Sequence, residues 1–111
     1  MGIHERQVGS VTVLVFKGRI DALTSPSIIE FIQAQIAKGN IKLVADLSGV
    51  DYTSSAGLRV LLGAIKETRA QNGDMRLAEV QPDVLKILNL SGVTNIMKNF
   101  DDVNSAVASY S

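Results

Sequence analysis

Short apolar runs alternate along the chain with segments of helical periodicity. Residues 10–18 are rich in β-branched side chains and end at a glycine, which predicts a strand. Alternating positions over residues 3–7, followed by the turn residues Gly9-Ser10, predict an earlier edge strand that pairs with it as a hairpin. Two later apolar runs, residues 41–47 and 75–80, predict two further strands.

Four segments predict helices, each bounded by residues that favour a helix start or stop. They run from Thr24-Ser25-Pro26 to Gly39-Asn40, from about Ser55 to Gln71, from Pro82 to Gly92, and onward from a capping Asp101. The second helix carries an apolar stripe at helical spacing, which we expect to face the sheet. The stripe consists of Leu58, Leu61, Leu62 and Ile65.

Strands that alternate with helices predict βαβ crossovers, and such crossovers join parallel strands. We therefore expect an α/β fold whose mixed, mostly parallel sheet has an N-terminal hairpin and about four helices. The length of 111 residues, 46% of them hydrophobic, predicts a single domain over residues 1–111. Residues 48–51 are expected to form a connection, and Ile96-Met97 a last short strand.

The charges balance, with 11 Lys and Arg residues against 11 Asp and Glu residues. Balanced charge gives no positive field for nucleic acid or anionic lipid, so we expect neither as a partner. The absence of cysteine excludes disulfides and thiolate nucleophiles and suits a reducing compartment. No apolar run approaches the roughly 18 residues that span a bilayer, and the start does not resemble a signal peptide. We expect a cytoplasmic protein with no membrane insertion.

No arrangement of residues points to an enzyme. The only histidine, His4, lies near a terminus, and no Gly-x-Ser-x-Gly motif is present. The spacing of Gly57 and Gly63 fits neither the P-loop nor the dinucleotide-binding fingerprint. Scattered carboxylates such as Asp21 and Asp51 are typical of a solvated surface, so we predict no catalytic activity, metal or cofactor.

Three consecutive hydroxyl residues, Thr53, Ser54 and Ser55, precede the second predicted helix. One hydroxyl is enough to cap a helix, so two remain unexplained. A hydroxyl at a helix start is also a suitable phosphoacceptor, because the positive end of the helix dipole tolerates the added charge. The small residues Ala56 and Gly57 leave room for the active site of a modifying enzyme.

Residues 46–58 read Asp-Leu-Ser-x-Val, four further residues, then Ser-x-Gly-Leu. This pattern resembles the signature of the STAS domain, and in particular of the bacterial anti-sigma factor antagonists. Residues 18–21 and 90–93 extend the resemblance over essentially the whole chain. It implies a switch: the unphosphorylated protein binds its anti-sigma factor, usually a serine kinase of the GHKL type, and frees a sigma factor. Serine phosphorylation ends the binding, and a PPM-type phosphatase restores it.

By motif position the resemblance implies Ser55 as the phosphoacceptor. Asp21 matches an acid near the kinase-contacting face, and Asp46 matches the acid that ends the strand leading to the site. Many antagonists have Asp where this chain has Ser54. Ser54 is therefore either the N-cap of the helix or, like Thr53, an alternative acceptor. Arg59, one turn later, is placed to pair with an added phosphate. We expect the partner-binding residues to be Asp21, Asp46, Ser54, Ala56, Gly57, Arg59, Val60 and Gly63.

Two alternatives stay open. The small apolar flank of the second helix, Val60, Gly63 and Ala64, either packs against a neighbouring helix or contacts a partner. The protein itself is either the phosphorylation switch or a non-switching STAS subunit, as in a lipid-transport ATPase complex or a stress-signalling scaffold. The Ser54 position, which lacks the usual carboxylate, motivates the second reading.

Overall fold

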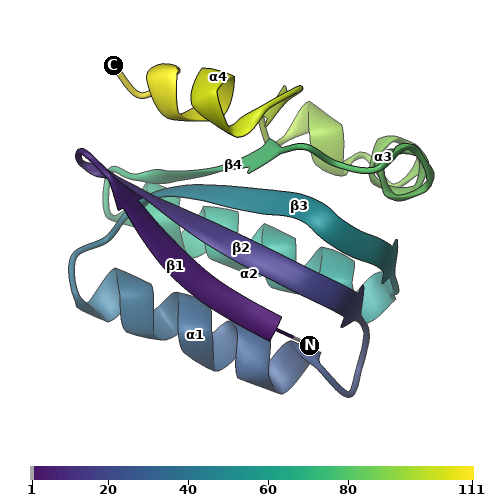
Figure 1. Cartoon of the computed structure of the whole chain (residues 1–111). Coiled ribbons are helices and arrows are strands. Elements are labelled where there is room, and N and C mark those ends of the chain that lie inside the picture. Colours follow the sequence, from purple (N-terminus) through teal and green to yellow (C-terminus); the bar gives the residue numbers. More distant parts are fainter. Residues whose placement is uncertain (1) are drawn as a thin grey trace.

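A five-stranded sheet with helices on both faces forms the fold (Figure 1). The computed structural model describes residues 2–111. Its elements are β1 (Gly2–Val8), β2 (Val11–Ile20), α1 (Ser25–Ala37), β3 (Lys42–Thr53), α2 (Ser55–Ala70), β4 (Asp74–Ala78), α3 (Pro82–Leu90), a 3-10 turn (Val93–Asn95), β5 (Asn99–Phe100) and α4 (Val103–Ala108). The strands lie in the order β1-β2-β3-β4-β5, with β1 antiparallel to β2 and every other pair parallel. The predicted α/β class and N-terminal hairpin are confirmed.

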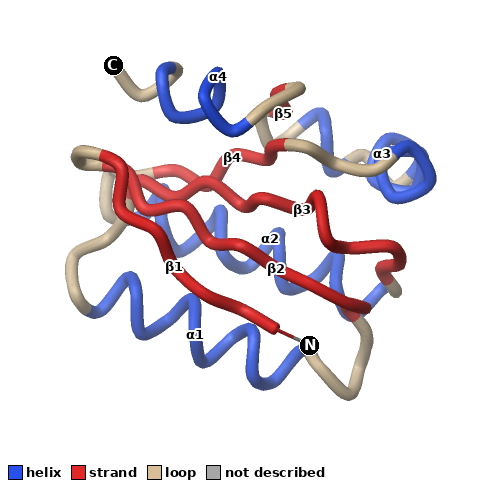
Figure 2. The backbone as a smooth tube through the Cα atoms, viewed as in Figure 1, coloured by secondary structure: helices blue, strands red, loops and turns tan. Residues whose placement is uncertain are grey.

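Both faces of the sheet are apolar because helices cover both. Helices α1 and α2 lie on one face and α4 on the other, as Figures 1 and 2 show. Successive residues of a strand point to opposite faces, so Leu43 and Ala45 join the core beneath α1 and α2, while Val44 joins a second core beneath α4. Helix α3 lies beside β3, where Val84 and Leu88 extend the first core.

Strand β3 is longer than predicted, and the expected connection at residues 48–51 is wrong. The register moves from Val15↔Asp46 to Lys17↔Gly49, so β3 gains one residue over β2, as in a β-bulge. A Cβ on Gly49 would lie 2.9 Å from the carbonyl oxygen of Phe16, which explains why glycine stands there. Ser48 and Gly49, expected to begin a connection, lie at this bulge, and β3 continues to Thr53.

Several element ends also differ from the predictions. Ile96-Met97 is not a strand, because Met97 is a buried core side chain and the last strand begins at Asn99. Asp102, rather than Asp101, caps α4 by accepting a 2.7 Å hydrogen bond from the Ser105 N–H. Strand β4 ends at Ala78, before Glu79 at a φ of 55°. Apolar composition alone did not locate these ends.

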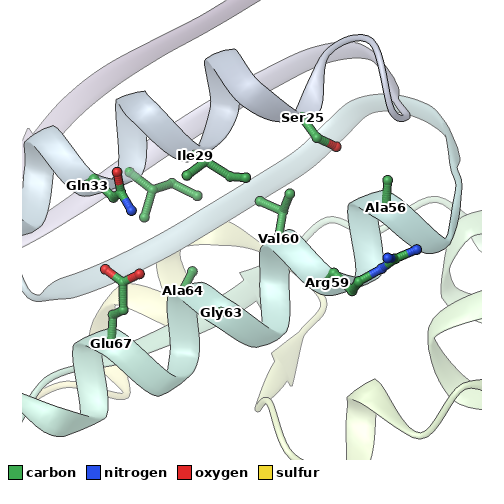
Figure 3. Close-up of a pocket in the computed structure, with 10 residues that line it drawn as sticks. Ser25, Ile29, Gln33, Ala56, Arg59, Val60, Gly63, Ala64 and Glu67 are labelled. Atoms are coloured by element: carbon green, nitrogen blue, oxygen red, sulfur yellow. The ribbon is translucent and has the colours of Figure 1, made fainter.

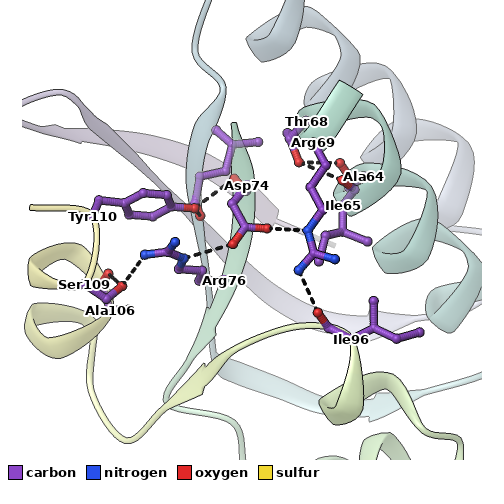
Figure 4. A network of polar contacts seen from close by, with 11 residues as sticks. Ala64, Ile65, Thr68, Arg69, Asp74, Arg76, Ile96, Ala106, Ser109 and Tyr110 are labelled. Atoms are coloured by element: carbon purple, nitrogen blue, oxygen red, sulfur yellow. Dashed lines mark hydrogen bonds and ion pairs between the residues drawn. The ribbon is translucent and has the colours of Figure 1, made fainter. Parts of the chain in front are cut away.

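The C-terminal end of α2 is held by a polar network (Figure 4). Asp74 is buried and pairs with Arg69 at 3.1 Å and with Arg76 at 3.0 Å. Arg69 also donates to the Ile96 carbonyl, and the Tyr110 hydroxyl lies 2.7 Å from the Leu43 carbonyl oxygen. Burial, reinforced by the nearby Asp74 carboxylate, raises the pKa of Tyr110 above its ordinary value. This network joins α2, β4 and the C-terminal segment.

Candidate functional site

The candidate site lies where β2 and β3 end, at the start of α2. The last residues of the two strands, Ile20 and Thr53, pair with each other. The next residue, Ser54, donates its backbone N–H to the Ile20 carbonyl oxygen at 2.9 Å. The β2–α1 loop and the first turn of α2 are therefore held at the same edge of the sheet, which Figure 2 shows near the carboxyl ends of β2 and β3.

The three hydroxyl residues have different surroundings. Thr53 is only 4% exposed, and its hydroxyl donates to the Ser54 carbonyl oxygen at 3.3 Å. Ser54 is the N-cap of α2, since its hydroxyl accepts a 3.2 Å hydrogen bond from the Ala56 N–H. Ser55, the first residue of the helix, is exposed. The structure thus places the capping role on Ser54 and leaves Ser55 outside it.

Arg59 is the charged group nearest to Ser55 in the described contacts. Its Nη2 lies 3.5 Å from the Ser55 hydroxyl oxygen, and its Nε lies 3.5 Å from the Ser55 carbonyl oxygen. Across residues 2–111, no carboxylate lies within 4.0 Å of its guanidinium. Within the described part of the chain, the hydrogen-bond contacts of this cation are both long, so it is available to an anion at the start of the helix.

Gly57 fixes how closely α2 approaches the strands. A Cβ at this position would collide with the Thr53 hydroxyl and would lie 2.7 Å from Cγ2 of Ile20. Gly57 itself is buried, so it faces the ends of β2 and β3 rather than solvent. It shapes the site from within, whereas its neighbour Ala56 is half-exposed.

Asp21 organises the loop next to the hydroxyl residues. Its carboxylate accepts hydrogen bonds from the backbone N–H groups of Leu23 at 3.0 Å and Thr24 at 3.1 Å. These bonds, that from Thr24 foremost, hold the pKa of the Asp21 carboxyl below its ordinary value, with a smaller contribution from Arg19. Thr24 is the N-cap residue of α1, and the sequence favoured a helix start there. Its hydroxyl, however, donates to the Arg19 carbonyl oxygen and makes no capping hydrogen bond.

Two exposed residues at this edge were missed in the sequence. Leu23 is 91% exposed at the tip of the loop that Asp21 organises. Tyr52, in β3 directly before the three hydroxyl residues, is exposed. The Arg19 guanidinium carbon lies over its ring, 4.7 Å from the ring centroid. No local pattern pointed to Leu23, and Tyr52 was missed because the strand was predicted to end at residue 47 whereas β3 extends to Thr53.

Asp46 is not brought to the site. It lies inside β3, seven residues before Thr53, and pairs with Ala78 of β4. Alternation along the strand places its side chain with Val44 on the α4 face, and its carboxylate accepts from the Ser48 N–H at 3.0 Å. The expectation that this acid ends a strand is wrong, because β3 continues past it.

The flank of α2 divides into two kinds of position. Val60 and Ala64 are buried in the core beneath α1 and α2, whereas Gly63 is exposed. All three line a groove of about 310 Å³ between the two helices, which begins at Ala56 beside the hydroxyl residues (Figure 3). On the expected apolar stripe, Leu61 and Ile65 are buried, while Leu58 and Leu62 pack against the same core at partial exposure.

Neither metal ligation nor membrane spanning finds support in the described part of the chain. Within residues 2–111, no group of three or more His, Cys, Asp or Glu side chains is arranged to hold a metal ion. None of the helices over the same residues has the length and apolarity needed to cross a bilayer.

The sequence and the fold both match known proteins. The sequence model described as the STAS domain matches residues 3–106. The putative anti-sigma factor antagonist BtrV of Bordetella bronchiseptica is 29% identical, over 94% of this chain and 90% of its own. The anti-sigma-B factor antagonist of Listeria monocytogenes is 30% identical, over 86% of this chain and 83% of its own. The crystal structure of a putative anti-sigma factor antagonist from Thermotoga maritima superposes with a TM-score of 0.92 at 20% identity, over 96% of this chain and 92% of that chain.

Proposed function

The chain belongs to the STAS domain family, and from this premise we propose that it is an anti-sigma factor antagonist controlled by phosphorylation of Ser55. In its unphosphorylated form it binds a cytoplasmic anti-sigma factor that is also a GHKL serine kinase, and a sigma factor is released. Phosphorylation ends this binding, and a PPM-type phosphatase restores it. Residues 1–111 act as one STAS domain that binds partners and catalyses no reaction.

The observation that carries the proposal is the division of roles among the three hydroxyls. Thr53 is buried, and Ser54 is occupied by the helix cap. Ser55 is exposed, and its only described side-chain contact is the long one with Arg59. A kinase therefore reaches Ser55 without unfolding the helix start, whereas Thr53 and Ser54 are linked to the structure around them.

A phosphate on Ser55 suits the folded chain. It adds about −1.5 to −2 charges at neutral pH, next to the positive end of the α2 dipole. Arg59 already lies beside the Ser55 hydroxyl and forms no ion pair within residues 2–111. We expect the phosphate to be stabilised within the chain, so that its effect falls on whatever binds this edge.

The partner surface that fits this switch combines the β2–α1 loop with the first turn of α2. Leu23 offers an exposed apolar anchor there, and Tyr52 offers an aromatic one. Arg59 forms no ion pair within residues 2–111 and supplies positive charge on the same edge, whereas Arg19 is paired with Asp21 at 3.7 Å. An acidic partner surface therefore fits beside Arg59 in the unphosphorylated chain. A phosphate on Ser55 would reverse the local charge and repel such a surface.

The test is phosphorylation by the cognate kinase, followed by intact-mass measurement. The unmodified chain and a Ser54→Ala variant are expected to gain one phosphate, and a Ser55→Ala variant none. Because Ser54 and Ser55 are neighbours of the same type, each variant is the control for the other. Phosphorylation of Ser55→Ala at the normal rate would refute the site. No phosphorylation of any form, together with stable binding to a transport-complex subunit, would favour the non-switching reading.

A further inference from the structure

The groove between α1 and α2 begins at the proposed switch, with which it shares Ala56 and Arg59, and extends beyond it along both helices. Its volume of about 310 Å³ lies within the range of roughly 300–1,000 Å³ that is common for small-molecule sites. Aliphatic side chains form its walls: Ile29 and Ile32 from α1, and Val60 and Ala64 from α2. Ile29 is 41% exposed although it is large and apolar. The groove is therefore largely apolar, and the chain itself leaves it open.

Side chains of opposite charge lie at the two ends of this groove. Arg59 lies at the Ala56 end of the groove, and Glu67 lies two turns further along α2, as Figure 3 shows. Arg59 also contacts Ser55 at 3.5 Å. Across residues 2–111, neither side chain forms an ion pair within 4.0 Å. An anionic group is attracted to the Arg59 end and repelled from the Glu67 end, which gives an elongated anionic ligand one preferred orientation.

Gly63 provides the space between these ends. A Cβ built on Gly63 meets no atom within 4 Å, so the groove is open at this position. Glycine in a helix interior costs about 0.5–1 kcal/mol relative to alanine, and no close approach of the kind seen at Gly57 requires it here. Gly63, which leaves the groove open, therefore lies midway along α2 between Arg59 and Glu67.

From the aliphatic walls, the unpaired Arg59 and the open position at Gly63, we propose that the α1–α2 groove binds a free medium-chain alkyl carboxylate. The carboxylate contacts the Arg59 guanidinium, and the alkyl chain lies along Ile29 and Val60 towards Gly63. The same arrangement brings the ligand's head group beside Ser55, because Arg59 contacts both. The proposal does not depend on phosphorylation of Ser55.

The direct test is calorimetric titration of the whole unphosphorylated chain with octanoate and decanoate below their micellar concentrations. Each buried CH₂ is expected to strengthen binding about fourfold, so decanoate should bind more tightly than octanoate. Decanol, which lacks the carboxylate, and the decyltrimethylammonium cation should both bind more weakly than decanoate. Equal binding of the cation, or no binding of decanoate at millimolar concentration, would overturn the proposal.

Two matched pairs of variants locate the ligand. Gly63→Leu fills the groove and should abolish decanoate binding, whereas Ala70→Leu adds the same side chain to an exposed position of α2 outside the groove. Arg59→Gln should weaken decanoate binding at least tenfold, whereas Lys66→Gln removes an exposed charge outside the groove. Circular dichroism verifies that each variant is folded, and Gly63→Ala serves as a milder obstruction if Gly63→Leu is not.

Decanoate binding that survives both Gly63 variants would contradict the proposal, because it would place the ligand elsewhere. The proposal would also be contradicted if decanoate does not bind the unmodified chain while Gly63→Leu binds a protein partner more weakly than the unmodified chain does. In that case the groove would be a protein-docking surface.

Discussion

The two ends of helix α2 are built in opposite ways. At the C-terminal end, Asp74 is buried between Arg69 and Arg76 with ion-pair distances of 3.1 and 3.0 Å. At the N-terminal end, Ser55 is exposed, and Arg59 approaches it only at 3.5 Å. One end has its polar groups satisfied and fixes the helix, while the other leaves a hydroxyl and a cation available to other molecules.

This difference separates residues that hold the fold from residues that are free to act. A buried charge that loses its partner costs several kcal/mol, whereas an exposed pair contributes little. A modification at the N-terminal end therefore changes the surface of the chain at small cost in stability. The C-terminal network keeps α2 in place while that surface changes. Substitutions at the two ends test this separation.

The largest effect is expected from breaking the Asp74 network. Asp74→Ala leaves Arg69 and Arg76 without their shared carboxylate and should lower the free energy of unfolding by roughly 3 kcal/mol. Asp21→Ala removes a carboxylate near the other end of α2, where its hydrogen bonds to the loop and its ion pair with Arg19 are exposed, and should cost less stability than Asp74→Ala. Urea unfolding of both variants measures the difference. Equal costs would show that the two ends do not differ as described.

The next effect contrasts the two glycines of α2. Gly57→Ala forces a methyl group against Thr53 and Ile20 and should destabilise the fold by about 1–3 kcal/mol. Gly63→Ala meets open space and should stabilise the helix by about 0.5–1 kcal/mol. Thermal unfolding of the two variants gives shifts of opposite sign. Stabilisation by Gly57→Ala would mean that the helix does not approach the strands so closely.

A smaller effect distinguishes the neighbouring serines. Ser54→Ala removes the helix cap and should cost about 1 kcal/mol of stability. Ser55→Ala should change stability by less than about 0.5 kcal/mol, because its hydroxyl has only a long contact with Arg59. Chemical denaturation of the two variants provides the comparison. A larger loss of stability from Ser55→Ala than from Ser54→Ala would show that Ser54 is not the cap.

The smallest effect concerns acid stability of the β2–α1 loop. Hydrogen bonds from Thr24 and Leu23 lower the pKa of Asp21 in the folded chain, so its contribution is present above the ordinary Asp range and is lost as pH falls through the lowered pKa. Carbon-detected NMR titration should show Asp21 titrating below 3.8, the ordinary value. Thr24→Ala removes the hydroxyl that also donates to the Asp21 carboxylate at 3.3 Å but keeps the stronger backbone bond, so it should move the pKa upward only slightly. A midpoint above 3.8 in the unmodified chain would contradict the loop geometry.

Local patterns predicted much of the fold because they act over a few residues. Pro26, Gly39 and Gly92 marked helix ends that the structure contains. The failures arose where a tertiary contact decides the outcome. Gly49 permits a bulge against Phe16, and Met97 fills the core instead of joining a strand. Neither role is visible in the surrounding sequence.

The sequence predicted which segment of the chain holds the candidate site, but not how its residues are arranged in space. The sequence indicated that one of three hydroxyls caps α2, but only the structure assigns that role to Ser54. The exposure of Leu23 depends on how separate elements pack, so no local motif reveals it. The α2 side of the groove was predicted as a small apolar flank, but its α1 side was not. Asp46 was expected at the site from its match to the motif, but β3 continues seven residues past it to Thr53 and its side chain faces the α4 side of the sheet.

The most direct test of the central claim compares the chain before and after stoichiometric phosphorylation by its cognate kinase. Calorimetry measures its affinity for the anti-sigma factor, and thermal unfolding measures its stability. The predicted result is an affinity that falls at least tenfold while the melting temperature stays within a few degrees. Unchanged affinity after phosphorylation at Ser55 would contradict the proposed switch.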